Sequence, residues 1–162
     1  MAPIALLADT HMPKGARRLP QRCAELVAGA EALVHAGDFI AATVLEELEA
    51  LCPVVHAVHG NVDEAVLRGS LPEVLELPLG DRLLAVVHDA GPARGRVQRM
   101  RERFPHADAV LFGHSHMPLH ESAGDFQIFN PGSPTERRRA PRRSMGMLHV
   151  EEHGLRFEHV WL

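Results

Sequence analysis

Five short apolar runs in this chain each lead into a residue that could bind a metal ion. The runs cover residues 4–8, 33–37, 54–60, 83–87 and 109–112, and their length and composition are typical of buried strands. In open α/β sheets, binding sites form beyond the carboxyl ends of the strands. We therefore expect a single site at this edge of the fold. Its candidate ligands are Asp9, His11, Asp38, Asn61, His88, His114 and His116.

The stretch Gly113-His114-Ser115-His116 follows the last of these runs. Side chains two residues apart in an extended chain point the same way, so both histidines can face one site. Two neighbouring histidines alone are more often part of a surface loop than of a metal site. The four other strand ends with ligand-type residues make the metal interpretation the stronger one.

The hydrophobic pattern predicts a layered α/β fold in a single domain, residues 1–162. In the first half, strands at 4–8, 32–36 and 54–58 alternate with helices at 20–28 and 41–51, which implies a parallel sheet. A short helical segment is expected at 63–68. The second half carries hairpin signals and should be mostly antiparallel. Its predicted elements are strands at 73–78, 82–88, 109–112, 119–121, 126–129, 145–150 and 155–161, and a basic helix at 92–104.

Composition limits the partners of the chain. With 162 residues, 46% hydrophobic and 23% charged, it suits one soluble domain, and its net charge of −4 gives no general attraction to nucleic acid or membranes. The chain has no tyrosine, so a stacking platform for bases is not expected. Cys23 and Cys52 are expected to be free, buried thiols. With no signal peptide or spanning segment predicted, we expect a cytoplasmic protein.

The predicted ligands mix carboxylate, amide and imidazole groups. This mixture favours Mn, Fe, Co, Ni or Zn over Ca and Mg, which prefer oxygen ligands throughout. Seven ligands are too many for one such ion and suit two, with Asp38 as the best candidate for a bridging carboxylate. A water shared by two cations becomes hydroxide near neutral pH, and the same cations bind phosphate oxygens.

The order of the motifs resembles that of the calcineurin-like metallophosphoesterases, and in particular the small bacterial and archaeal YfcE-type phosphodiesterases. The resemblance implies a four-layer α-β-β-α sandwich of two facing mixed sheets with outer helices. It also implies one metal held by Asp9, His11, Asp38 and His116, and a second held by Asp38, Asn61, His88 and His114. The motifs are Asp9-x-His11, Gly37-Asp38, Gly60-Asn61-x-Asp63, His88, Gly113-His114-Ser115-His116 and Asn130-Pro131-Gly132-Ser133.

The implied function is hydrolysis of a small phosphate ester, favouring a diester, by in-line attack of a metal-bridging hydroxide. Asp38, Asn61 and His114 are the candidate catalytic residues. The cofactors would be two divalent ions, with manganese preferred and Ni, Co, Fe or Zn also suitable. One alternative is a phosphomonoesterase or nucleotidase. Another is a non-catalytic protein-binding scaffold such as the retromer subunit of the same fold, and a homo-oligomer is a further option.

Several residues close to the candidate ligands are expected to have their own role in the site. Val62 follows Asn61 where many relatives carry a histidine thought to protonate the leaving group, so leaving groups that depart unaided should be preferred. His59 and Asp89 are candidate substrate contacts, although Asp89 could instead orient a histidine or cap the helix at 92–104.

Asp63 is expected to cap a helix or support the ligands. The basic run 137–143 is interpreted as a solvated loop, with an arginine that clamps phosphate, or pairing with an acidic patch on another subunit, as the alternatives.

Overall fold

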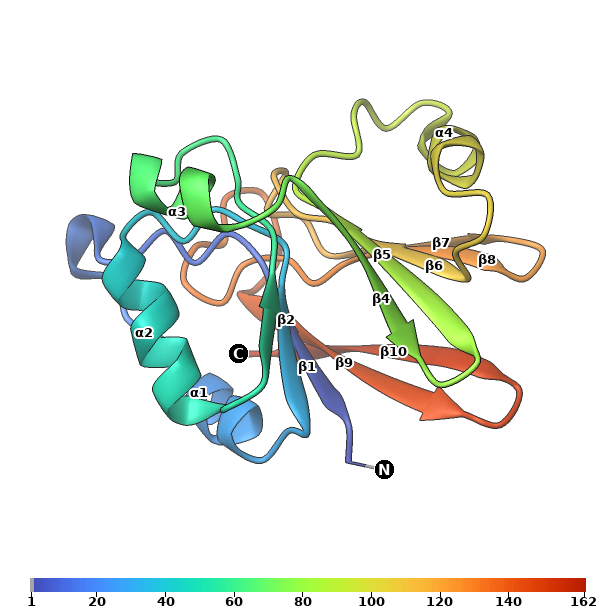
Figure 1. Ribbon diagram of the computed structural model, residues 1–162. Helices are drawn as coiled ribbons and strands as arrows, with labels where there is room; N and C mark the ends of the chain where they lie inside the picture. Colours follow the sequence, from blue (N-terminus) through green and yellow to red (C-terminus); the bar gives the residue numbers. More distant parts are fainter. Residues whose placement is uncertain (1) are drawn as a thin grey trace.

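Two five-stranded sheets face each other in the computed structural model, which describes residues 2–162 (Figure 1). In the first sheet, β1, β2 and β3 pair in parallel, and β9 joins β1 and β10 in antiparallel fashion. The strand order is β10-β9-β1-β2-β3. The strands are β1 (Ile4–Leu7), β2 (Ala32–His35), β3 (Val55–Ala57), β9 (Ser144–Glu151) and β10 (Gly154–Trp161).

The second sheet is more parallel than the hairpin signals indicated. Its order is β4-β5-β6-β8-β7, and β6 pairs in parallel with both β5 and β8. The hairpin pairs β4-β5, β7-β8 and β9-β10 are antiparallel, as expected for the second half of the chain. The pair β5-β6 is parallel because a helix joins the two strands, and such crossovers join parallel strands. The strands are β4 (Val74–Leu79), β5 (Arg82–Val87), β6 (Ala109–Leu111), β7 (Leu119–Ala123) and β8 (Phe126–Asn130).

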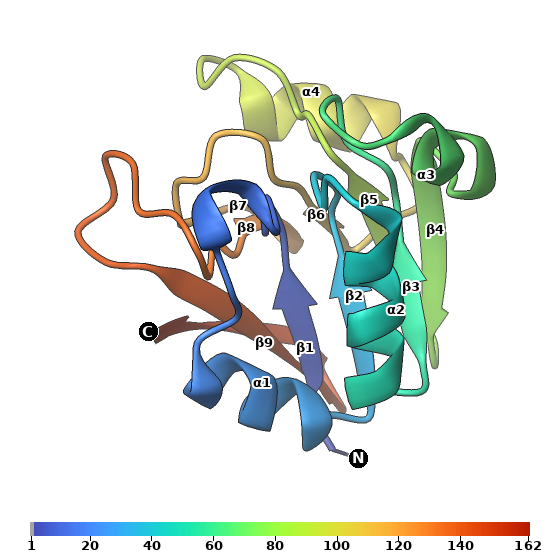
Figure 2. The same cartoon turned by 90° about the vertical axis from the view of Figure 1, so that its left-hand side faces the viewer.

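The helices cover the outer faces of the sheets and complete four layers. Figures 1 and 2 show α1 and α2 against the first sheet and α4 against the second. Short segments η1 and α3 lie in the loops that follow β1 and β3. The elements are η1 (Lys14–Ala16), α1 (Gln21–Ala28), α2 (Ala42–Leu51), α3 (Ala65–Ser70) and α4 (Arg96–Arg103). The predicted α-β-β-α sandwich is confirmed.

Three apolar clusters correspond to the three interfaces between the layers. All four residues of β1 are buried, because alternate side chains face the opposite sheet and the helices. Leu6 packs between the sheets, whereas Leu7 packs toward α1 and α2. Phe112 and Met100 belong to the third cluster, under α4. Burial on both faces explains why the strands read as continuous apolar runs.

Helix α4 begins at Arg96, four residues later than predicted. Gly95 precedes it in the left-handed region with φ of 70°. The guanidinium of Arg99 donates to the carbonyls of Ala90 and Pro92, at 2.8 and 2.6 Å. Arg99 therefore stabilises the loop that joins β5 to α4. None of the helices within residues 2–162 is long and apolar enough to cross a membrane, and both cysteines are free and buried, as predicted.

His35, at the end of β2, is buried completely, as expected for a structural histidine. Its Nδ1 accepts a hydrogen bond from the Gly37 amide at 3.1 Å, so its Nε2 carries the proton and donates to Thr10 Oγ1 at 3.2 Å. The ring also stacks on Phe39, with 3.7 Å between centroids. Burial lowers the pKa of His35 to about 3.

This histidine should make stability depend on pH. Between pH 6.5 and 3 the unfolded chain binds a proton at His35 that the folded chain does not, so the free energy of unfolding falls as pH falls through this window. His35→Asn keeps an acceptor for Gly37 but removes the titration. We expect a smaller loss of unfolding free energy between pH 7 and pH 4.5, measured with urea, than in the wild type. Exposed His106→Asn is the control, and equal losses in all three proteins would contradict the prediction.

Candidate metal centre

Asp9, His11 and His116 form one group of ligand-type side chains, and all three are buried. Asp9 and His11 follow β1, and His116 lies in the loop after β6. One ligand atom from each residue lies within 4.8 Å of the others. Asp9 Oδ1 is 3.6 Å from His116 Nε2 and 3.9 Å from His11 Nε2.

Asp38, His88 and His114 form a second group with the same spacing. Asn61 joins them, because its Oδ1 lies 2.9 Å from His88 Nε2 and 3.2 Å from His114 Nδ1. These residues follow β2, β5, β6 and β3, respectively. The structure thus brings together all seven side chains that were predicted from the sequence as candidate ligands.

The carboxylate of Asp38 lies between the two groups. Its Oδ2 is 3.3 Å from His11 Nε2 in the first group and 3.1 Å from His88 Nε2 in the second. Its Oδ1 accepts a hydrogen bond from the Val62 amide at 3.0 Å. This is the position that a carboxylate shared by two cations would occupy.

The loops that carry these candidate ligands have backbone conformations that are rare for residues other than glycine. Five ligands have left-handed backbone, with φ between 45° and 70°. A non-glycine residue in this region costs roughly 1–3 kcal/mol and persists only where its surroundings impose it, which is common at functional sites. The five are Asp9, His11, Asp38, His114 and His116.

Asp63 is part of the structure that imposes these conformations. Its buried carboxylate accepts hydrogen bonds from the amides of Asp38, Ile40 and Gly60, at 3.1, 2.8 and 2.6 Å. It therefore fastens the loop after β2 to the loop after β3. Asp63 is not a helix cap, because Glu64 precedes α3 and makes no side-chain capping bond.

Several buried polar atoms of the first group have no hydrogen-bond partner among residues 2–162. Within residues 2–162, Asp9 Oδ2, His11 Nε2 and both ring nitrogens of His116 make no hydrogen bond. Burial raises the pKa of Asp9 to about 7 and lowers that of His116 to about 3. Unpaired buried groups are costly, and a divalent cation would accept the lone pairs of the Asp9 carboxylate and of one nitrogen of each imidazole. The residues present therefore fit a metal.

In the second group, contacts between Asp38 and the histidines shift the pKa values in the direction opposite to burial. Burial acts to raise the pKa of Asp38, but the imidazoles of His11 and His88 lower it more, so its pKa lies well below the usual value. Burial acts to lower the pKa of His88, and contact with Asp38 raises it above its usual value. Asp38 is thus an anion over the whole physiological range.

A small pocket of about 170 Å³ adjoins Asn61 and His88. His59 and Asp89, the predicted substrate contacts, both line it, together with Glu73 and Arg103. Asp89 Oδ1 accepts a hydrogen bond from the Gly91 amide at 2.8 Å, so it ends a turn and does not cap α4.

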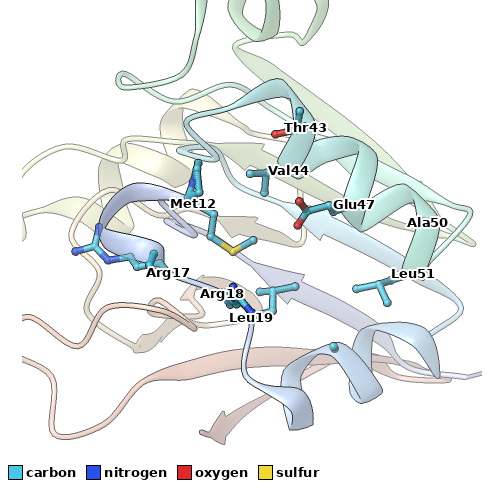
Figure 3. Close-up of a pocket in the computed structure, with 12 residues that line it drawn as sticks. Met12, Arg17, Arg18, Leu19, Thr43, Val44, Glu47, Ala50 and Leu51 are labelled. Carbon is cyan, nitrogen blue, oxygen red and sulfur yellow. The ribbon is translucent and has the colours of Figure 1, made fainter.

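A larger cavity of about 670 Å³ lies between α1, α2 and the loop after β1. In Figure 3 the side chain of Met12 points into this cavity and that of Arg17 points away from it. Apolar side chains such as Leu19, Val44 and Leu51 contribute much of its lining. None of the seven candidate ligands lines this cavity.

Sequence reasoning missed how the segment after Asn130-Pro131-Gly132-Ser133 serves the site. Ser133 Oγ donates to the Asp9 carbonyl at 2.8 Å, and Thr135 Oγ1 donates to the Thr10 carbonyl at 2.6 Å. Glu136 then places a carboxylate 3.4 Å from His116 Nδ1. Ser133 belongs to the quoted motif, and for Thr135 and Glu136 the sole signal was their position next to it.

Comparisons with known proteins agree with this geometry. The chain matches the model of the calcineurin-like phosphoesterase superfamily domain over residues 3–153. It is 33% identical over 138 residues to a probable metallophosphoesterase of Methanothermobacter thermautotrophicus, covering 82% of this chain and 77% of that protein. It is 28% identical over 139 residues to phosphodiesterase MJ0936 of Methanocaldococcus jannaschii, covering 80% and 82%.

A zinc complex of Vps29 from Entamoeba histolytica superimposes with a TM-score of 0.77 at 18% identity, covering 98% of both chains. At that identity the likeness shows the fold alone. The layered sandwich and its converging ligands define an α/β protein with a candidate metal centre at the strand ends. More specifically, the chain belongs to the calcineurin-like phosphoesterase superfamily.

Gly60 offers a test of the geometry around Asp38. A Cβ at this position would collide with Asp38 Oδ1 and with the Asp38 amide. We expect Gly60→Ala to displace the carboxylate and to weaken Mn²⁺ binding by roughly 10-fold or more, measured by calorimetric titration. Gly69→Ala, where a Cβ meets nothing within 4 Å, is the matched control. Wild-type affinity in Gly60→Ala would contradict the placement of Asp38.

Proposed function

We propose that this protein is a phosphodiesterase that uses two divalent metal ions. The observation that carries the proposal is the position of Asp38 Oδ2, within 3.3 Å of an imidazole from each ligand group. Membership of the phosphoesterase superfamily and similarity to a protein named phosphodiesterase support the reaction class.

Each ligand group would hold one ion. Asp9, His11 and His116 would bind the first, Asn61, His88 and His114 the second, and Asp38 both. Two bound cations would supply an acidified water and would neutralise charge on the phosphoryl oxygens. Manganese is our first choice, and Ni, Co, Fe and Zn also suit these ligands.

Exposure indicates which ligands the substrate would meet. His114 is 47% exposed, whereas the side chains of His11 and His116 are almost fully buried. Asn61 is also exposed. We therefore propose Asn61 and His114 as catalytic residues that face the substrate. Asp38 is buried and is the third catalytic residue because it would hold both ions. His59 and Asp89, in the adjoining pocket, would contact the ester group of a small-molecule substrate.

A protein-binding scaffold is the second candidate function, because the fold is shared with Vps29. That structure contains zinc, so metal binding alone does not distinguish the two functions. Turnover does. Relative rates on diesters and monoesters would in turn separate a phosphodiesterase from a phosphomonoesterase or nucleotidase.

The activity itself is the main test. Metal-stripped protein should hydrolyse bis-p-nitrophenyl phosphate after addition of Mn²⁺, and faster than p-nitrophenyl phosphate. Asp38→Asn should lose roughly 100-fold or more of this rate, because both ions lose a ligand. Asp125→Asn, an exposed carboxylate in the β7–β8 turn, is the control. Binding of metal with no turnover of either compound would favour the scaffold.

Leaving-group dependence is a separate expectation. Val62 carries no acid at the position next to Asn61, so a poor leaving group receives no proton from it. We expect aryl diesters to be cleaved far faster than alkyl diesters of similar size, in steady-state assays at one metal concentration. Similar rates for both would show that another group protonates the leaving oxygen.

A further inference from the structure

Glu136 lies behind the most deeply buried histidine of the metal centre. Its Oε2 is 3.4 Å from His116 Nδ1, on the side of the ring away from the other ligands. The opposite nitrogen, Nε2, is 3.6 Å from Asp9 Oδ1. His116 is therefore placed between a carboxylate that would share its metal and a carboxylate that would not.

The two ring nitrogens of His116 indicate a role for Glu136. The ring is 1% exposed, and neither nitrogen has a hydrogen-bond partner within residues 2–162. Binding a cation requires a lone pair on Nε2, which puts the proton on Nδ1. That buried N–H then needs an acceptor, and Glu136 Oε2 is the carboxylate facing it.

Glu136 is itself held in place. Arg17 Nη2 lies 3.4 Å from Oε2, and Arg138 Nε lies 3.5 Å from Oε1. The Glu136 amide donates to Ser133 Oγ at 3.0 Å, and Ser133 Oγ donates in turn to the Asp9 carbonyl. The carboxylate side chain is 25% exposed, and its position is fixed by two guanidiniums and by the loop that also supports Asp9.

We propose that Glu136 is a positioning residue that fixes the tautomer and orientation of His116 for metal binding. It accepts the Nδ1 proton and so directs the Nε2 lone pair toward Asp9 and His11. Carboxylate–histidine–metal arrangements of this kind raise the basicity of the ligand, and loss of the outer partner typically weakens metal binding 10- to 100-fold. The inference rests on the proposed metal centre but not on any activity toward phosphate esters.

A purely structural role is the competing explanation. Glu136 could serve to neutralise Arg17 and Arg138 in the loop, with its distance to His116 a by-product of that pairing. Ion pairs that remain partly exposed to solvent contribute little to stability. In that case its removal would leave the histidine tautomer and the metal affinity unchanged.

The first measurement is the tautomer of His116 in metal-free protein, by ¹⁵N NMR, with the resonance assigned by its absence in His116→Gln. We expect the Nδ1–H form in the wild type and loss of its predominance in Glu136→Ala. Glu136→Gln, which can still accept a hydrogen bond, should retain more of it. Glu152→Gln, an exposed residue in the β9–β10 turn, should match the wild type.

The second measurement is Mn²⁺ binding by calorimetric titration. In Glu136→Ala one binding step should weaken roughly 10- to 100-fold and the other should not change, with Glu136→Gln intermediate. Unaltered tautomer and affinities in both folded variants would overturn the proposal. Two bound ions without diester hydrolysis would refute the proposed function and leave this inference standing. A wild type that binds no metal would overturn both.

Discussion

The contact between Asp38 and the imidazoles of His11 and His88 is the interaction on which the site depends. These residues come from three strands and from both sheets, so they meet only when the sheets face each other in the observed register. His88 also joins the sheets directly, because its Nδ1 lies 2.8 Å from the Ala36 carbonyl at the end of β2. Packing between the sheets and assembly of the site are therefore one event.

The same arrangement is costly in the absence of metal. Among the residues that the structure describes, one carboxylate oxygen and three imidazole nitrogens of the first group are buried without a hydrogen-bond partner, and five candidate ligands have left-handed backbone. Asp63 and Ser133 offset part of this cost by satisfying backbone groups of the ligand loops. The apolar clusters on both faces of β1 also stabilise the strand that leads into this site. The protein thus maintains a site whose polar atoms are arranged for a ligand and not for each other.

The sequence predicted the fold and the convergence of the seven candidate ligands, because both depend on local pattern. Apolar runs mark the strands, and a polar residue at each end marks the site. The sequence could not indicate that β6 pairs in parallel with β8, since that pairing is decided by tertiary packing. Asp63 is expected from the sequence to support the ligands or cap a helix, but its hydrogen bonds to the distant amides of Asp38 and Ile40 could not be foreseen. Nor could the sequence reveal that Glu136 lies beside His116, because the two residues are far apart in the chain. Hydrogen bonds of this kind leave no periodic signal.

Substrate choice must rest with few residues, because most of the surrounding loops are already committed to structure. The loop from β5 to α4 is held by the guanidinium of Arg99, and the segment after Ser133 is tied to the backbone of the loop after β1. Such loops can adjust little to a bound ester. The side chains beside Asn61 include those of Val62, His59 and Asp89, which carry an apolar surface, an imidazole and a carboxylate. If the proposed function holds, differences in substrate among proteins with these candidate ligands should therefore follow changes at these positions.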